Sequence, residues 1–266
     1  MALMIWKGLL AGFALLALPL PAVAAETAGA LKARPVAGTT AHLPPGYTKL
    51  SFNAVAYAPR SLKPGTPAPL LVILHGVGDS GRSFIKSFEQ EAERRGMLLL
   101  ALQASGQTWD LIDSRNAGSG SAMMMMRGSV EPRFGRDVGR IDAVLSEIFS
   151  RAWIDQARIA LFGFSDGATY ALSLGTANPK LFRTLIAFAP GFVTLPRMVY
   201  PSQRIFLAHG RSDEVFSIAR NGAAILALLR SGGLPVHFRP FAGGHEVDPE
   251  VKAEAIDFFL SGKTPG

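Results

Sequence analysis

The sequence predicts an α/β protein in which helices cover both faces of a mostly parallel sheet. The first indication is that the strand-like stretches are continuously apolar, as expected for strands buried on both faces. The second is that these stretches alternate with segments whose apolar residues recur at helical spacing, an order that favours parallel strands joined by helical crossovers. The predicted strands are residues 69–74, 97–102, 158–162, 184–188, 204–208 and 235–241.

The chain begins with a segment typical of a secretory signal. Lys7 is the only charge in residues 1–25, and an apolar run over residues 8–18 is followed by prolines and small residues. A run of about 11 residues is too short to cross a ~30 Å hydrocarbon core as a helix. We therefore expect cleavage after Ala24 or Ala25 and a periplasmic or secreted protein. The alternative is an uncleaved, tilted membrane anchor.

Residues 26–46 predict a linker or loosely draped arm, because they are rich in Ala, Gly, Thr and Pro and show no apolar periodicity. The 266 residues allow one or two domains. The regular alternation of elements favours one domain over residues 47–266. No large cap domain is expected, because no insertion exceeds about 25 residues, which is small beside a typical domain.

Four helical patterns lie between or after the predicted strands. One side of residues 82–95 is charged and the other carries aromatic and aliphatic residues. Residues 137–149 place their apolar side chains on one stripe, and residues 217–230 and 249–260 do the same. Such amphipathic segments are typical of helices that pack one face on a sheet.

The composition excludes several classes of protein. With 48% hydrophobic residues and no cysteine, the chain is neither a disordered tail nor a disulfide-stapled miniprotein. The formal net charge of +7 would attract anionic partners such as nucleic acid. However, Lys and Arg are scattered rather than gathered in one run, so we expect a solvated basic surface and no nucleic-acid partner.

A serine flanked by glycines follows the predicted strand 158–162 directly. The motif is Gly163-Phe164-Ser165-Asp166-Gly167, and a helical pattern continues from it. Glycines let the backbone turn sharply between strand and helix, which places the serine hydroxyl at a helix N-terminus. This context predicts a nucleophile at Ser165. The alternative is a glycine-rich turn in which Ser165 only caps the helix.

A serine nucleophile needs a general base and an acid that orients the base. Among five histidines, His245 lies on a loop after the last predicted strand, at the sheet edge where Ser165 is expected. Asp213 follows the strand 204–208 at the same edge and is the predicted acid, with Glu214 as its neighbouring competitor. Alternatively, His245 is a surface histidine without a catalytic role.

Two backbone amides are candidates for stabilising an oxyanion. The turn His75-Gly76-Val77-Gly78 follows the strand 69–74 and can present the amide of Val77. The amide of Asp166, next to the nucleophile, would be the second donor. The alternative for the first turn is an ordinary glycine turn.

Five motifs therefore occur together, at residues 74–79, 163–168, 189–192, 209–215 and 244–246. In this combination the chain resembles the α/β-hydrolase superfamily, and within it the phospholipase/carboxylesterase group of serine esterases. The resemblance implies the α/β-hydrolase fold and ester hydrolysis by Ser165, Asp213 and His245, with Val77 and Asp166 as oxyanion donors. Asp166 stands where Gln or His is more usual, and the export signal is unexpected for the cytosolic members.

The sequence thus predicts a serine hydrolase that cleaves small-molecule or lipid-like carboxylic esters through an acyl-enzyme, with no metal and no cofactor. The alternatives are a secreted polyester or feruloyl-type esterase, a peptidase or amidase on the same triad, and a non-catalytic binding protein of this fold. Residues 109–133 are expected to lie over the site. Their methionines, Met123 to Met126, would line an acyl pocket or plug the core.

Overall fold

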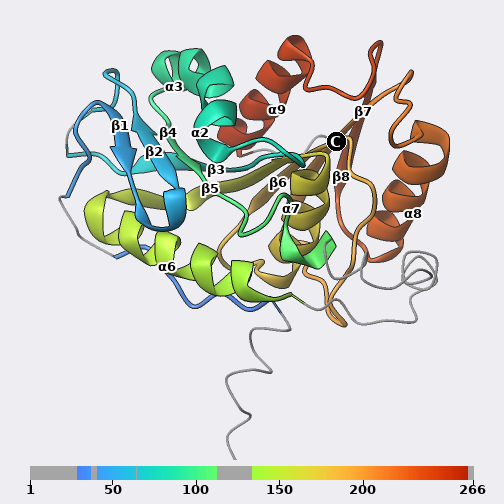
Figure 1. Cartoon of the computed structure of the whole chain (residues 1–266), viewed down its shortest axis with the longest axis horizontal. Coiled ribbons are helices and arrows are strands. Elements are labelled where there is room, and N and C mark those ends of the chain that lie inside the picture. The colour runs from blue at the N-terminus through green and yellow to red at the C-terminus, as the bar shows by residue number, and fades with distance from the viewer. Residues whose placement is uncertain (1–28, 37–40, 64, 113–133, 263–266) are drawn as a thin grey trace, which may run out of the picture.

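The computed structural model describes residues 29–36, 41–63, 65–112 and 134–262. Eight strands form one sheet in the order β1-β2-β4-β3-β5-β6-β7-β8 (Figure 1). Strands β1 and β2 pair antiparallel to each other, and β2 pairs antiparallel to β4, whereas all other pairs are parallel. The strands are β1 (Gly46–Lys49), β2 (Val55–Ala58), β3 (Ala68–Leu74), β4 (Leu98–Ala101), β5 (Ile154–Phe164), β6 (Thr184–Phe188), β7 (Arg204–Gly210) and β8 (Val236–Phe241).

Helices cover both faces of this sheet, as predicted (Figure 1). Helices α6, α7 and α8 lie on one face and α2, α3 and α9 on the other. Their bounds are α2 (Gly81–Phe84), α3 (Glu89–Arg95), α6 (Arg136–Arg151), α7 (Asp166–Ala177), α8 (Ala223–Ser231) and α9 (Pro249–Ser261), with short helical turns η2 (Ile85–Phe88) and η3 (Ile218–Gly222).

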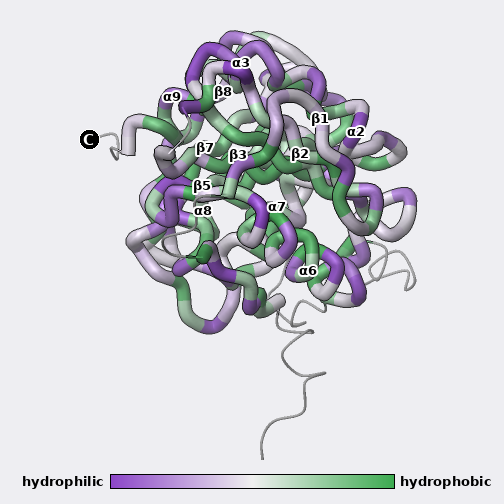
Figure 2. Tube along the Cα trace, turned by 90° about the vertical axis from the view of Figure 1, so that its left-hand side faces the viewer, coloured by the Kyte–Doolittle hydropathy of each residue, from purple (hydrophilic) through white to green (hydrophobic). Residues whose placement is uncertain are grey.

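The central strands are buried on both sides, which explains their continuous hydrophobicity. In β3, Leu70 and Val72 belong to the core under α6 and α7, whereas Leu71 and Ile73 belong to the core under α3 and α9. Figure 2 shows hydrophobic residues gathered along the strands in the middle of the molecule. The mostly parallel, doubly covered sheet predicted from the sequence is therefore confirmed.

Two strands and two helical segments differ from the prediction. Strands β1 and β2 have four residues each, and the side chains of β1 alternate between half-buried and exposed, so neither gives a long apolar run. The predicted helix 82–95 is divided into α2, η2 and α3. At the junction, Phe88 has φ −109° and its ring packs edge-on against Phe162, with 4.9 Å between centroids. The segment predicted as helix 217–230 begins with the wider π turn η3.

Part of the segment predicted as a loose arm is docked on the domain. Leu31 and Ala33 are buried in the core, and alternate residues face outward. The amide of Leu31 donates to Asn178 Oδ1 at 2.8 Å, and Asn178 Nδ2 donates to the carbonyl of Gly29 at 2.7 Å. Asp142 Oδ1 accepts hydrogen bonds from the backbone amides of Lys32 and Ala33, at 2.7 Å each. Residues 29–36 therefore tie α6 to the end of α7.

Replacing Asn178 by Ala should destabilise the fold by about 1–3 kcal/mol, because it removes three side-chain hydrogen bonds from a buried position. Urea unfolding at neutral pH measures this change. Gln156→Ala is the matched control: its amide reaches the carbonyl of Pro35 at 3.5 Å from an exposed position and should contribute little. Equal stabilities for the two variants would show that residues 29–36 do not stabilise the domain.

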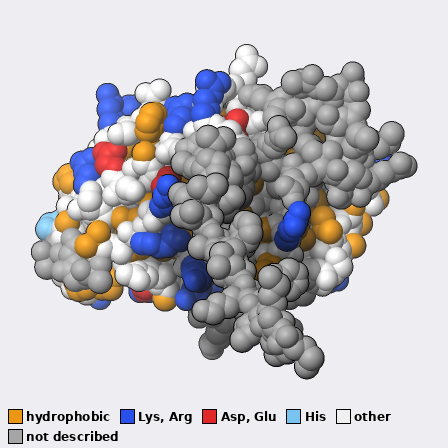
Figure 3. All heavy atoms as spheres, turned by 90° about the horizontal axis from the view of Figure 1, so that it is seen from below, with side chains coloured by type: hydrophobic (Ala, Val, Ile, Leu, Met, Phe, Trp, Pro, Cys, Tyr) orange, Lys and Arg blue, Asp and Glu red, His pale blue; other side chains and the backbone are white. Residues whose placement is uncertain are grey.

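None of the helices in the described ranges combines the length and apolar character that a membrane span requires. On the face shown in Figure 3, the Lys and Arg side chains that are drawn in colour lie dispersed among apolar and uncharged ones.

Candidate active site

Ser165 lies on a strained turn between β5 and α7. Its φ is 56° and its ψ is −121°, a conformation that non-glycine residues rarely adopt. The turn is held by a hydrogen bond from the Ser165 amide to the carbonyl of Phe188 at 2.9 Å. A Cβ at Gly163 would lie 2.1 Å from the carbonyl oxygen of Gly167, so any larger side chain there would collide with backbone. Gly163 and Gly167 are therefore required in this motif, because neighbouring backbone leaves no room for a side chain.

The structure brings the three predicted side chains into one hydrogen-bonded chain. His245 Nε2 lies 2.8 Å from Ser165 Oγ, and His245 Nδ1 lies 2.8 Å from Asp213 Oδ2. The Asp213 side chain is fully buried, and its other oxygen accepts from the amides of Val215 and Phe216 at 2.9 and 2.8 Å. With the proton of His245 on Nδ1 toward Asp213, Nε2 is free to accept the proton of the serine.

The loops that follow β7 and β8 contact each other, and this contact places Asp213 next to His245. The amide of Ser212 donates to the carbonyl of Gly243 at 2.9 Å. A Cβ at Gly210 would come within 2.1 Å of the carbonyl oxygen of Gly244, so glycine permits this close approach. These contacts fix the separation of the two loops.

The imidazole of His245 is also held by two aromatic rings. The rings of Phe164 and Phe216 have their centroids 5.0 and 5.5 Å from that of His245. Packing against two rings limits the orientations available to the imidazole. The ring is thus fixed by packing as well as by its two hydrogen bonds.

His209, for which the sequence predicts no chemical role, lies beside the site. Its side chain is fully buried, and its Nε2 lies 3.4 Å from Asp213 Oδ2, the same oxygen that contacts His245. His209 Nε2 is also close to the carbonyl of Phe216. His209 lies in β7 and Asp213 in the turn after it, so no helical spacing in the sequence indicates this contact.

The two predicted oxyanion donors lie on elements that adjoin Ser165. Asp166 is the first residue of α7, so its amide has no partner within the helix. A Cβ at Gly76 would lie 3.4 Å from Cβ of Ser165, so the turn that carries Val77 passes directly beside the serine. The turn that carries Val77 and the first residue of α7 thus both adjoin Ser165, and the role of the two amides as donors stays a prediction.

Residues 107–109, of which Trp109 begins the segment predicted to lie over the site, contact both of these elements. Trp109 Nε1 donates to the carbonyl of His75 at 2.9 Å, and the amide of Gly78 donates to the carbonyl of Gln107 at 2.9 Å. Thr108 Oγ1 donates to Asp166 Oδ2 at 2.6 Å. Residues 107–109 thus link the turn that carries Val77 to the start of α7.

His75, whose carbonyl accepts the hydrogen bond from Trp109, is buried in its neutral form. Nδ1 lies 2.7 Å from the carbonyl oxygen of Gly76, to which only an N–H can donate, and Nε2 accepts from the amide of Ala104 at 3.2 Å. Only the neutral imidazole with its proton on Nδ1 satisfies both partners. Desolvation on burial lowers the pKa of His75.

Acidification should therefore weaken the fold through His75. Because its pKa is lower in the folded state than the unfolded value near 6.5, the unfolded chain takes up the proton first. The stability is complete above about pH 6.5 and is lost as the pH falls below it, by up to about 1.4 kcal/mol per pH unit for this group. Urea unfolding between pH 7.5 and 5.5, in roughly half-unit steps, measures this loss. His75→Gln should show a shallower pH dependence than the wild type, and identical slopes would assign the effect to other groups.

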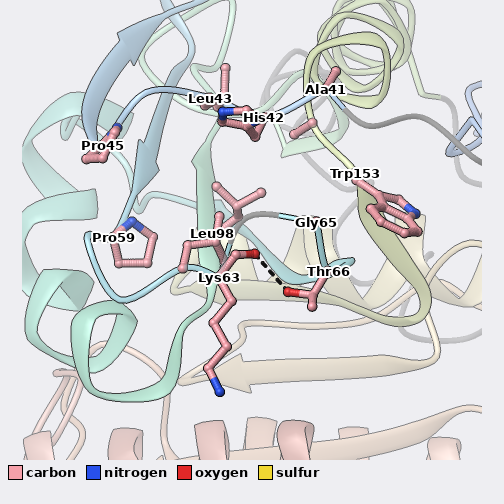
Figure 4. A pocket seen from close by; sticks show the side chains of 12 residues that line it. Ala41, His42, Leu43, Pro45, Pro59, Lys63, Gly65, Thr66, Leu98 and Trp153 are labelled. Atoms are coloured by element: carbon pink, nitrogen blue, oxygen red, sulfur yellow. Dashed lines mark hydrogen bonds between the residues drawn. The ribbon is translucent and has the colours of Figure 1, made fainter.

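A hollow of about 170 Å³ opens at the opposite edge of the sheet (Figure 4). It is lined by Leu98 at the start of β4 and by Trp153 just before β5, together with Leu43 and Pro59. Ser165 follows the other end of β5, so this hollow is separate from the triad.

Met123 to Met126, predicted to lie over the site, fall outside the described residues. Within the described ranges, no group of three or more His, Asp or Glu side chains is placed to hold a metal ion.

The sequence matches the family described as Phospholipase/Carboxylesterase over residues 62–261. Esterase YpfH of Escherichia coli (strain K12) is 32% identical over 125 residues, which cover 44% of this chain and 54% of that protein. The putative esterase NocK of Nocardia uniformis subsp. tsuyamanensis is 28% identical over 190 residues, covering 68% of this chain and 50% of that protein. The chain thus spans about half the length of the curated relatives it matches.

Solved structures share the fold. The crystal structure of esterase PE8 superposes with a TM-score of 0.56 at 22% sequence identity, covering 81% of this chain and 98% of that one. At this identity the similarity concerns the fold alone. It agrees with the α/β-hydrolase architecture expected from the motifs.

Proposed function

Because the chain belongs to the phospholipase/carboxylesterase family of α/β-hydrolases, we propose that it is a serine esterase that cleaves small-molecule or lipid-like carboxylic esters. The observation that carries the proposal is the relay from Asp213 through His245 to Ser165, with 2.8 Å at each step. A serine within reach of a neutral imidazole, itself oriented by a buried carboxylate, is the arrangement that activates a hydroxyl for acyl transfer.

The reaction would proceed through an acyl-enzyme. His245 Nε2 takes the proton of Ser165 as the serine oxygen attacks the ester carbonyl carbon, and the imidazolium is stabilised by Asp213. The tetrahedral intermediate collapses, and the alcohol leaves with the proton from His245. Water then attacks the acyl-enzyme with His245 again as base, and the acid is released as the serine regains its proton.

The amides of Val77 and Asp166 would stabilise the negative oxygen of both tetrahedral intermediates. A fixed backbone donor in such a site contributes about 3 kcal/mol to the transition state. The bonds from residues 107–109 hold the two elements that carry these amides, so the donors would be in place before the substrate binds. The positive end of α7 also favours negative charge next to Ser165.

Ester and amide substrates that are otherwise matched test the proposal. The protein should hydrolyse p-nitrophenyl esters over a series of acyl chain lengths and should turn over the corresponding p-nitroanilides more slowly. A fluorophosphonate should label the folded protein at Ser165, as read by peptide mass spectrometry. Faster turnover of the anilides would assign an amidase or peptidase instead. Absence of both labelling and turnover would favour a non-catalytic binding protein.

Export is a separate part of the proposal. We propose that residues 1–25 direct the protein to the periplasm or beyond and are removed after Ala24 or Ala25. The support is the order of Lys7, apolar run, prolines and small residues in the sequence. Fractionation of cells that express the full chain, with the intact mass of the recovered protein, tests it. A membrane-bound chain that retains Met1 would instead favour the anchor.

A further inference from the structure

A second hollow, of about 600 Å³, lies on the catalytic side of the sheet near β2 and β4. Three of its lining residues are the cations Lys49, Arg82 and Arg140, and we call it the basic pocket. No Asp or Glu is among the described residues that line it. Its other polar side chains are uncharged and belong to Asn53, Ser80, Gln103 and Ser105. The pocket is therefore a region of concentrated positive charge.

The acids closest to the basic pocket in the sequence are already engaged elsewhere. Asp79 accepts the amide of Ser80 at 2.7 Å, and both oxygens of Asp137 accept backbone amides. Asp142 Oδ1 accepts two backbone amides of residues 29–36. Glu147 is bonded to Arg151, and Glu89 accepts the hydroxyl of Tyr47. None of these contacts neutralises a cation of the pocket.

Arg140 is only partly satisfied. Its Nη2 makes one long bond to the carbonyl of Phe52, at 3.4 Å, and its guanidinium lies 5.1 Å from the centroid of the Phe52 ring. Its Nε is buried and has no acceptor in the described part of the chain. A guanidinium held on a ring with donors to spare is suited to receive an anionic oxygen group.

The position of the basic pocket relates it to the nucleophile. Gln103 and Ser105 follow β4, and Ser80 follows the turn that carries Val77, so the pocket lies at the edge where Ser165 follows β5. Strand β3 separates β4 from β5. With about 4.8 Å between neighbouring strands, the lateral separation from the end of β4 to that of β5 is about 10 Å.

We propose that the basic pocket binds a carboxylate or phosphate group carried by the ester substrate, at a distance from the scissile carbonyl. The inference rests on the proposed esterase function and narrows its substrate class to esters with a remote anionic end. Lys49 and Arg82 are exposed and would attract the anion, and Arg140 would supply directed hydrogen bonds.

Mono-p-nitrophenyl esters of linear dicarboxylic acids, from succinate to dodecanedioate, test the substrate class against their methyl-capped counterparts. One acyl chain length should span the distance between Ser165 and the basic pocket. At that length, kcat/KM should be about tenfold higher for the acid-ended ester, as expected for one charge-assisted contact. The preference should diminish with added salt, because the cations are partly exposed. Equal kcat/KM values at every length, in an active enzyme, would overturn the proposal and leave the esterase function intact.

Matched variants assign the preference to the basic pocket. Lys49→Gln and Arg82→Gln should reduce the acid-ended preference several-fold and leave turnover of the methyl-capped ester unchanged. Arg183→Gln removes the same charge from an exposed position just before β6, at the opposite edge of the sheet, and should retain the wild-type preference. An equal loss in all three variants would mean that overall charge, not the pocket, selects the substrate.

Binding to the Ser165→Ala protein decides the proposal independently of catalysis. By calorimetry, the acid-ended ester should bind more tightly than the methyl-capped ester, and Arg82→Gln in this background should reduce the difference in affinity several-fold. This readout holds even if the wild type proves inactive on both esters, which would count against the esterase function alone. If inorganic phosphate binds but the two esters bind equally, the pocket is a site for a free anion and the substrate assignment is wrong.

Discussion

Replacing Ser165 by Ala should lower kcat for p-nitrophenyl esters by several orders of magnitude while leaving the fold intact. The change removes only the hydroxyl oxygen that lies 2.8 Å from His245 Nε2. The backbone turn depends on the close glycines and on the amide bond to Phe188, and neither involves that hydroxyl. Initial rates at saturating ester concentration measure the loss, and circular dichroism with thermal unfolding checks the fold.

Ser212→Ala is the matched control for this variant. Ser212 is an exposed serine one residue before Asp213, and it contributes a backbone amide, not its hydroxyl, to the bond with Gly243. Its kcat should stay close to that of the wild type. Comparable turnover by the Ser165→Ala and wild-type proteins would reject Ser165 as the nucleophile, whatever the geometry around it.

The contact among Ser165, His245 and Asp213 could be predicted from the sequence because each residue follows a predicted strand. A glycine-flanked serine between strand and helix, and an acid and a histidine after successive strands, must meet at one edge of a parallel sheet. The sequence placed Asp213 ahead of Glu214, and in the structure it is Asp213 that contacts His245.

The supporting contacts could not be predicted in the same way. Thr108, which bonds to Asp166, and His209, beside Asp213, depend on where loops cross in space, and no periodic pattern encodes such crossings. Likewise, residues 29–36 lack an apolar period, yet two alternate side chains and the acceptors Asn178 and Asp142 are enough to dock them. The basic pocket combines residues from β1, α2 and α6, so its three cations look scattered in the sequence.

Two residues at the site are held in conformations or environments that lower the stability of the fold. The strained Ser165 and the buried neutral His75 each cost folding free energy. Both lie where β3 and β5 end, between the two large cores on either face of the sheet. Because those cores fix the strand ends, the strained turn persists and the serine is presented without rearrangement.

If the proposed triad operates, replacing Asp213 by Asn should lower kcat by about 10⁴-fold, the magnitude of the same substitution in a serine protease. The variant keeps the size of the side chain, but an amide can donate a hydrogen bond to Nδ1 and so favour the tautomer with its proton on Nε2. In that tautomer the nitrogen facing Ser165 is a donor and cannot accept the serine proton. The bonds from the amides of Val215 and Phe216 can still form to the carbonyl oxygen of Asn, so the loop should keep its shape.

Glu214→Gln removes a charge of the same sign from the next residue, which is exposed, and should leave kcat close to that of the wild type. The pH dependence separates the two explanations of a loss in Asp213→Asn. If the tautomer is wrong, activity should rise at high pH, where hydroxide can replace the base, whereas a collapsed loop would show little activity at any pH. Loss of activity in Glu214→Gln with retention in Asp213→Asn would transfer the orienting role to Glu214 and contradict the 2.8 Å contact between Asp213 and His245 as the functional one.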